Sequence, residues 1–133
     1  MKTLRDIKIG DTLFCIDISQ NFVAENYSGC TYPSKLITDI EVKKIELDEG
    51  FFYFNGSDYN RRYYLKVELD KIDAELYIDK GKYYFADTER KDEFVRTIVV
   101  EKINSIQKQI KANRLSNEKV IEEIRKTYYH ILK

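Results

Sequence analysis

The sequence is poor in several residue types, and each shortage argues against a class of protein. Its 133 residues include one proline and five glycines, too few for a collagen-like or low-complexity disordered chain. Its longest uninterrupted apolar stretches, such as residues 51–54, are much too short to cross a bilayer, so we expect no membrane association. Residues 1–11 lack the apolar segment of a signal peptide, which favours a cytoplasmic protein.

Histidine and cysteine, which supply many catalytic and metal-binding groups, are also scarce. The one histidine, His130, falls in the last turn of a predicted helix, where a cation simply suits the helix dipole. Cys15 belongs to an apolar strand-like run and Cys30 to a loop, without zinc-ligand spacing, and the sequence does not decide whether they are free or paired. The glycines stand singly, so no phosphate-binding loop is present. We predict a non-enzymatic protein with no catalytic residue, no cofactor and no metal ion.

A charge excess of either sign is absent as well. Lys and Arg number 23, and so do Asp and Glu, whereas a non-specific nucleic-acid binder usually carries a basic surplus. The carboxy-terminal residues 89–133 are mildly basic, with eleven basic and seven acidic side chains. A solvated helix face explains this bias, and a surface that contacts a polyanion is the alternative.

The residues before Asp87 alternate between apolar and polar side chains, which is typical of strands. The alternation predicts five strands and an uncertain sixth within 72–78; the five cover residues 12–19, 36–47, 51–55, 63–69 and 83–86. Within 36–47 the apolar parity changes, which predicts a β-bulge or a switch of the buried face near residues 38–43. Turns are predicted at 48–50, 55–58 and 79–82, and residues 20–35 read as a long polar loop.

After Asp87 the apolar residues follow helical spacing, and neither glycine nor proline occurs. Asp87 and Thr88 offer a helix N-cap, and residues 112–114 interrupt the stripe before a second cap at Ser116. We therefore predict a β-barrel-like domain over 1–87 and a two-helix extension over 88–133. The extension is expected to pack on that domain or on a second subunit, in which case the helices would form a homodimer.

The most distinctive segment is FFYFNGSDYNRRYY, residues 51–64, which combines seven aromatic rings with two adjacent arginines. We predict that partner-binding residues lie here, namely Tyr53, Tyr59, Arg61, Arg62 and Tyr63.

This aromatic–arginine segment has three interpretations. The rings fill the core and cover its rim, with either Phe52 and Phe54 or Phe51 and Tyr53 inside. Alternatively, Tyr and Arg anchor a protein partner, since both are favoured at interface hot spots. The third interpretation is a platform on which single-stranded nucleic acid or RNA stacks its bases, aided by the basic helices.

Metal-dependent nucleases place an acid and an E-x-K strand together, so that the acids hold Mg²⁺ and the lysine steadies the attacking water. Asp39, Glu41 and Lys43 fit that spacing. In a chain that is 35% charged the arrangement is expected by chance, and alternating charge on the outer side of a strand explains it better.

Two segments carry a resemblance to a known group of proteins. I-x-x-G-D-x-L-F-x-I at residues 7–16 and KYYFADTERKDEF at 82–94 resemble small SH3-like barrel proteins of bacteriophage and mobile-element type. The chain departs from that group at Lys91 and Asp92, where a second acidic residue and an alanine are expected. The resemblance covers roughly residues 4–95 and implies a small binding module with no transferable catalytic residues.

We therefore predict an α+β protein: an antiparallel SH3-like barrel, or a strongly curved five- to six-stranded sheet, followed by two C-terminal amphipathic helices. The expected function is protein–protein contact, in a phage or mobile-element protein that inhibits or adapts a host protein. Single-stranded nucleic-acid binding and metal-dependent nuclease activity are the alternatives.

Overall fold

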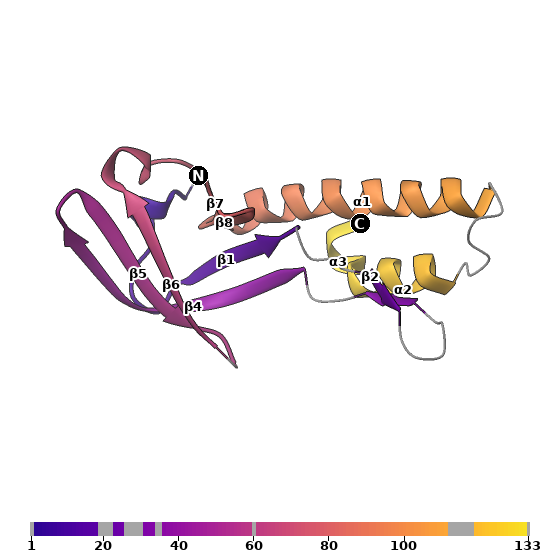
Figure 1. The fold of residues 1–133 in the computed structure, drawn as a ribbon, viewed down its shortest axis with the longest axis horizontal. Coiled ribbons are helices and arrows are strands. Elements are labelled where there is room, and N and C mark those ends of the chain that lie inside the picture. The colour runs from indigo at the N-terminus through magenta and orange to yellow at the C-terminus, as the bar shows by residue number, and fades with distance from the viewer. Residues whose placement is uncertain are drawn as a thin grey trace. The chain divides into compact units, whose positions relative to one another are not determined.

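The computed structural model describes residues 2–18, 23–25, 31–33, 36–59, 61–111 and 119–132 (Figure 1). The chain divides into two compact units. The sheet unit comprises residues 1–19 and 36–91, and the helical unit comprises residues 20–35 and 92–133. The domain boundary that the sequence predicts at residue 87 stays a prediction. In the structure, the segment 20–35 groups with the helices, and the first turn of the long helix groups with the sheet.

The sheet unit contains one six-stranded antiparallel sheet, which curls into a half-barrel (Figure 1). Its strands are β1 (Thr12–Asp17), β4 (Ile37–Asp48), β5 (Phe51–Ser57), β6 (Arg62–Glu68), β7 (Leu76–Asp79) and β8 (Lys82–Phe85). Their order across the sheet is β6-β5-β4-β1-β8-β7, which leaves β6 and β7 as the edges. The Tyr77 hydroxyl on β7 donates to the Lys66 carbonyl oxygen on β6 at 3.2 Å, so a side chain joins the two edges.

The predicted α+β class is confirmed, as is a strongly curved six-stranded antiparallel sheet followed by helices. The more specific SH3-like barrel stays a prediction. The tight turns at Gly50 and Gly81 are also confirmed, because both glycines adopt a positive φ, of 86° and 79°.

The predicted bulge lies in β4, between Val42 and Lys44. Val42 pairs with Gly56 on β5, and Lys44 already pairs with Asn55, so Lys43 is the extra residue. A Cβ on Gly56 would lie 2.6 Å from the Glu41 carbonyl oxygen and 2.6 Å from the Ile40 Cγ2. Only glycine therefore allows β5 to approach the bulged strand this closely.

The prediction of a turn at residues 55–58 is wrong because Gly56 lies within a strand and pairs with β4. Asn55, Gly56 and Ser57 continue strand β5, and the chain reverses only after Asp58. Gly56 looks like a turn residue in the sequence, but it serves the close approach to β4.

The core of the sheet unit lies on the inner side of the curled sheet. Its buried members come from strands β1, β4, β5, β6 and β8 and from the segments beside them, while β7 adds the partly buried Tyr77: Leu4, Ile7, Leu13, Cys15, Ile40, Val42, Phe54, Leu65, Val67, Ile72, Tyr84 and Ala86. Cys15, which the sequence places in an apolar strand-like run, is a buried member of this core with its thiol free.

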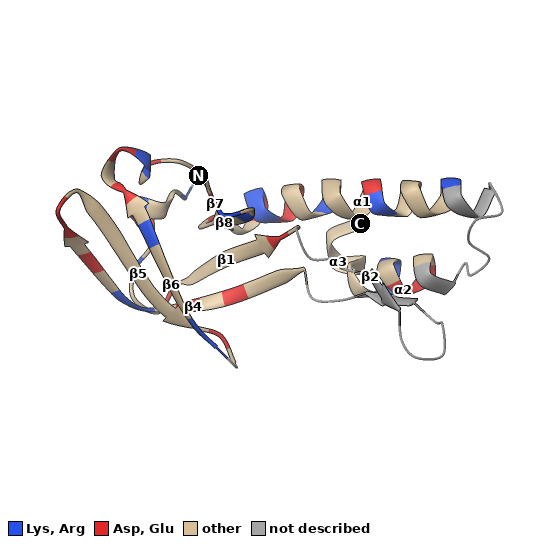
Figure 2. Ribbon diagram, viewed as in Figure 1, with Lys and Arg blue, Asp and Glu red and all other residues tan. Residues whose placement is uncertain are grey.

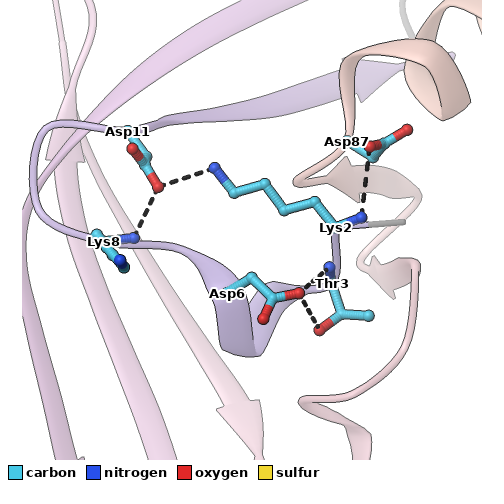
Figure 3. A network of polar contacts seen from close by, with 6 residues as sticks. All are labelled: Lys2, Thr3, Asp6, Lys8, Asp11 and Asp87. Atoms are coloured by element: carbon cyan, nitrogen blue, oxygen red, sulfur yellow. Dashed lines mark hydrogen bonds and ion pairs between the residues drawn. The ribbon is translucent and has the colours of Figure 1, made fainter.

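A polar network ties the amino-terminal segment to β1 and to the start of the long helix (Figure 3). The Lys2 Nζ pairs with the Asp11 carboxylate at 2.8 Å, and the same carboxylate accepts the backbone N–H of Lys8 at 2.9 Å. Asp87 accepts the backbone N–H of Arg90 at 3.0 Å, which confirms it as the N-cap of the helix.

The helical unit contains α1 (Thr88–Lys111, which starts in the sheet unit), α2 (Lys119–Thr127) and the short α3 (Tyr129–Leu132). The second predicted helix is therefore interrupted near Tyr128. The predicted loop 20–35 contains β2 (Val23–Glu25) and β3 (Thr31–Pro33), which pair antiparallel, and β3 lies against α2. Cys30 and Ser116 fall outside the described residues. In the described part of the chain, no helix has the length and apolar character of a membrane span.

Replacing Gly56 by alanine tests the close approach at the bulge. We expect Gly56→Ala to lower the free energy of unfolding by about 1–3 kcal/mol, because the added methyl meets a backbone oxygen that cannot move away. Urea denaturation measures the effect, and Ser57→Ala on the same strand is the control. Equal stabilities of the two variants would contradict the geometry.

Stability at high pH tests the burial of Tyr84. Burial raises the pKa of the Tyr84 hydroxyl, and its contact with Cys15 raises it further. Below the ordinary tyrosine pKa of about 10 the resulting stabilisation is complete, and it is lost as the pH rises towards the folded-state pKa. We expect Tyr84→Phe to reduce the alkaline loss of stability by about 1.4 kcal/mol per pH unit. Urea denaturation at several pH values between about 10 and 12 measures this loss. The same dependence of the unfolding free energy on pH in the variant and in the unmodified chain would contradict the prediction.

Candidate binding face

Alternation along β5 decides which of its aromatic rings enter the core. Phe54 is buried, and Phe52 stacks beside it with a centroid distance of 6.3 Å. Phe51 and Tyr53 therefore point to the outer side of the sheet. Of the two alternatives left open by the sequence, the one with Phe52 and Phe54 inside is confirmed.

The outer side of β5 and β6 carries a cluster of three aromatic rings. The ring of Tyr53 lies 6.4 Å from that of Phe51 and 5.8 Å from that of Tyr64. The Lys66 Nζ lies 4.0 Å from the centre of the Phe51 ring and 5.8 Å from that of Tyr53, within the range of cation–π attraction. Tyr64 remains 60% exposed, so the cluster is a surface feature.

Charged residues of both signs occur along β4 and β6 (Figure 2), and strand pairing places some of them beside this cluster. We define the binding face as the aromatic cluster Phe51, Tyr53 and Tyr64 with its charged neighbours on β4 and β6, which are Glu41, Lys43, Lys44, Glu46, Asp48, Arg62, Lys66 and Glu68. Acids and bases are equal in number among these neighbours. Some pair with each other, Lys44 with Glu46 at 2.6 Å and Lys43 with Glu41 at 3.0 Å.

The turn between β5 and β6 is held by Asp58. Its carboxylate accepts the Arg61 backbone N–H at 2.7 Å and the Tyr63 hydroxyl at 3.1 Å, and its own N–H donates to the Arg61 carbonyl at 3.0 Å. Tyr59 stands at the tip, 98% exposed. Arg61 and Arg62 are also exposed.

The five predicted site residues therefore occupy three different environments. Tyr53 and Arg62 lie on the binding face, and Tyr59 and Arg61 lie in the adjoining turn. Tyr63 is half-buried and packs against the core from the inner side, opposite Gly56. Sequence reasoning did not single out Tyr64 and Lys66, although both share the parity of Arg62 along β6.

The acids and lysine of the nuclease hypothesis lie along β4. Asp39 and Glu41 are exposed, and the Lys43 Nζ is engaged by Glu41. Within the described residues, no group of three or more Asp, Glu, His or Cys side chains lies close enough to hold a metal ion.

Comparison of the chain with protein families, with curated proteins and with solved structures gives no match. The resemblance to small SH3-like barrel proteins stays a prediction. What the binding face does must therefore follow from its own chemistry.

Removing the Asp58 carboxylate tests how the turn is held. Burial raises the pKa of Tyr63, and the hydrogen bond to Asp58 raises it further. We expect Asp58→Ala to lower the Tyr63 pKa and to reduce the free energy of unfolding by about 1 kcal/mol. A spectroscopic pH titration and urea denaturation measure these effects. Asp58→Asn, which retains an acceptor oxygen, should retain most of the stability; equal losses in both variants would contradict the role of the hydrogen bonds.

Proposed function

We propose that this chain is a non-enzymatic binding protein that contacts a protein partner through the binding face. The observation that carries the proposal is the exposed aromatic cluster on β5 and β6. Rings of Tyr53 and Tyr64 that are held against each other lose little conformational freedom on binding, and they offer apolar area together with a hydroxyl. Such rings are typical anchors of protein interfaces.

The charges around the cluster favour a protein over a nucleic acid. A strand of nucleic acid presents phosphates at every step, so a binding groove for it needs a basic surplus. Here Glu46, Asp48 and Glu68 lie beside the rings, and the acids of the face equal the bases in number. A mixed rim of this kind suits a protein surface with complementary charges of both signs.

The biological role belongs to the proposal as well. From the resemblance stated above, we propose a phage or mobile-element protein that inhibits or adapts a host protein in the cytoplasm. An inhibitor of this type needs only a shaped surface with a few well-held anchors, and the binding face supplies both.

A differential capture experiment tests the proposal. The purified chain, Tyr53→Ser/Tyr64→Ser and Ile9→Ser are each immobilised and exposed to host extract, with and without nuclease treatment. Ile9, which is 67% exposed, lies before β1 and provides a matched loss of exposed apolar surface. We expect the chain and the Ile9 variant to retain the same protein, and the double-tyrosine variant to lose it by at least about tenfold, the effect of removing two interface anchors.

Three outcomes would contradict the proposal. One is equal capture by all three proteins, and another is no retained protein at all. The third is loss of capture on nuclease treatment, together with oligonucleotide binding that falls steeply with salt and disappears in Arg61→Ala/Arg62→Ala; this result would establish the nucleic-acid alternative.

A further inference from the structure

The helical unit contains an open groove of about 410 Å³. Its described lining comes from α1 and from α2–α3: Val100, Ile103, Asn104, Gln107, Arg125, Tyr129 and Leu132. Binding sites for small organic molecules typically measure about 300–1,000 Å³ and combine apolar walls with a few polar groups. Both the volume and the composition of this groove match that description.

The groove follows directly from helical periodicity. On α1 the lining residues recur three and four positions apart, from Val100 to Gln107, and on α2–α3 they do so from Arg125 to Leu132. Each lining stripe runs beside a buried stripe of the same helix, which contains Val99 and Ile106 on α1 and Ile124 and Ile131 on α2–α3. The helices thus bury one stripe and leave most of the next one exposed as a wall, in which Ile103 is the buried member.

A hydrogen bond fixes one end of the two walls. The Arg96 Nε on α1 donates to the Ile131 carbonyl oxygen on α3 at 2.7 Å. Arg96 lies one helical turn before Val100, and Ile131 immediately precedes Leu132. The walls are therefore held in place before any ligand arrives, which lowers the entropic cost of binding.

The walls expose apolar surface, and the charge on their described residues is positive. Val100 is 41% exposed and Tyr129 is 64% exposed. Arg125 is the charged member of the described lining, and with the described residues it forms no ion pair. Asn104 and Gln107 add amide donors on the facing wall.

We propose that this groove binds a small amphipathic anion, with an aromatic or aliphatic body between Val100, Ile103 and Tyr129 and a carboxylate or sulfonate on Arg125. A guanidinium matches such a group with two parallel donors. The site is separate from the binding face on the sheet unit, and it does not depend on the function proposed for that face.

Two matched dyes test the proposal by fluorescence titration. 8-Anilinonaphthalene-1-sulfonate carries a sulfonate, and N-phenyl-1-naphthylamine has the same ring system without a charge. We expect both dyes to bind, the anionic one more tightly. Arg125→Gln should weaken the anionic dye about tenfold, the loss of a charge-assisted hydrogen bond, and should leave the neutral dye unchanged. Lys126→Gln, on the same helix but outside the groove, should change neither.

Two substitutions of opposite charge at Val100 test whether the dye binds in the groove. Val100→Glu should weaken the anionic dye and Val100→Lys should strengthen it, whereas the neutral dye should respond alike to both. Because Val100 is partly exposed, neither change buries a charge. The proposal is overturned if neither dye binds, if Arg125→Gln and Lys126→Gln behave alike, or if the two Val100 variants affect the anionic dye equally.

Discussion

The contact between Gly56 and the bulge of β4 sets the geometry of the sheet unit. One extra residue in β4 strengthens the local twist of the sheet, and the missing Cβ on β5 lets the paired strand follow it. Beyond the bulge, Ile45 replaces Val42 as the inward-facing apolar residue of β4. The sheet curls far enough for Tyr77 on one edge strand to reach the backbone of the other edge at Lys66.

The same geometry separates the aromatic residues of β5 into two groups with different roles. Phe52 and Phe54 stack on the inner side, where burial of such rings stabilises the fold. Phe51 and Tyr53 stay on the outer side, where Lys66 covers part of their surface without removing it from solvent contact. An aromatic-rich strand can therefore supply rings to the core and to the outer surface at once, and the two kinds of ring alternate residue by residue.

Much of this architecture could be predicted from local patterns. The strand alternation, the parity change that marks the bulge, the glycine turns and the Asp87 cap all depend on neighbours in sequence. The prediction of a turn at 55–58 was wrong because the role of Gly56 depends on its close contact with β4. No local pattern reveals such a contact between strands. The short strands β2 and β3 were missed for a similar reason, since three residues are too few to show alternation.

The candidate site was predictable as a segment but not as a surface. Composition identified residues 51–64, yet it could not decide which side of the sheet each ring occupies. Tyr63 was grouped with Tyr53 although it faces the core side, and Lys66 was overlooked although it lies over two of the rings. Register between strands supplies this information, and a one-residue shift would exchange the two sides completely.

The most direct test of this account compares truncations at two adjacent positions of β5. We expect Phe54→Ala to reduce the free energy of unfolding by about 3–5 kcal/mol, as for a fully buried ring, and Tyr53→Ala to reduce it by less than about 1 kcal/mol. Chemical denaturation of the two variants gives both values. Similar losses, or a larger loss for Tyr53→Ala, would show that the inner and outer sides of the sheet are assigned wrongly.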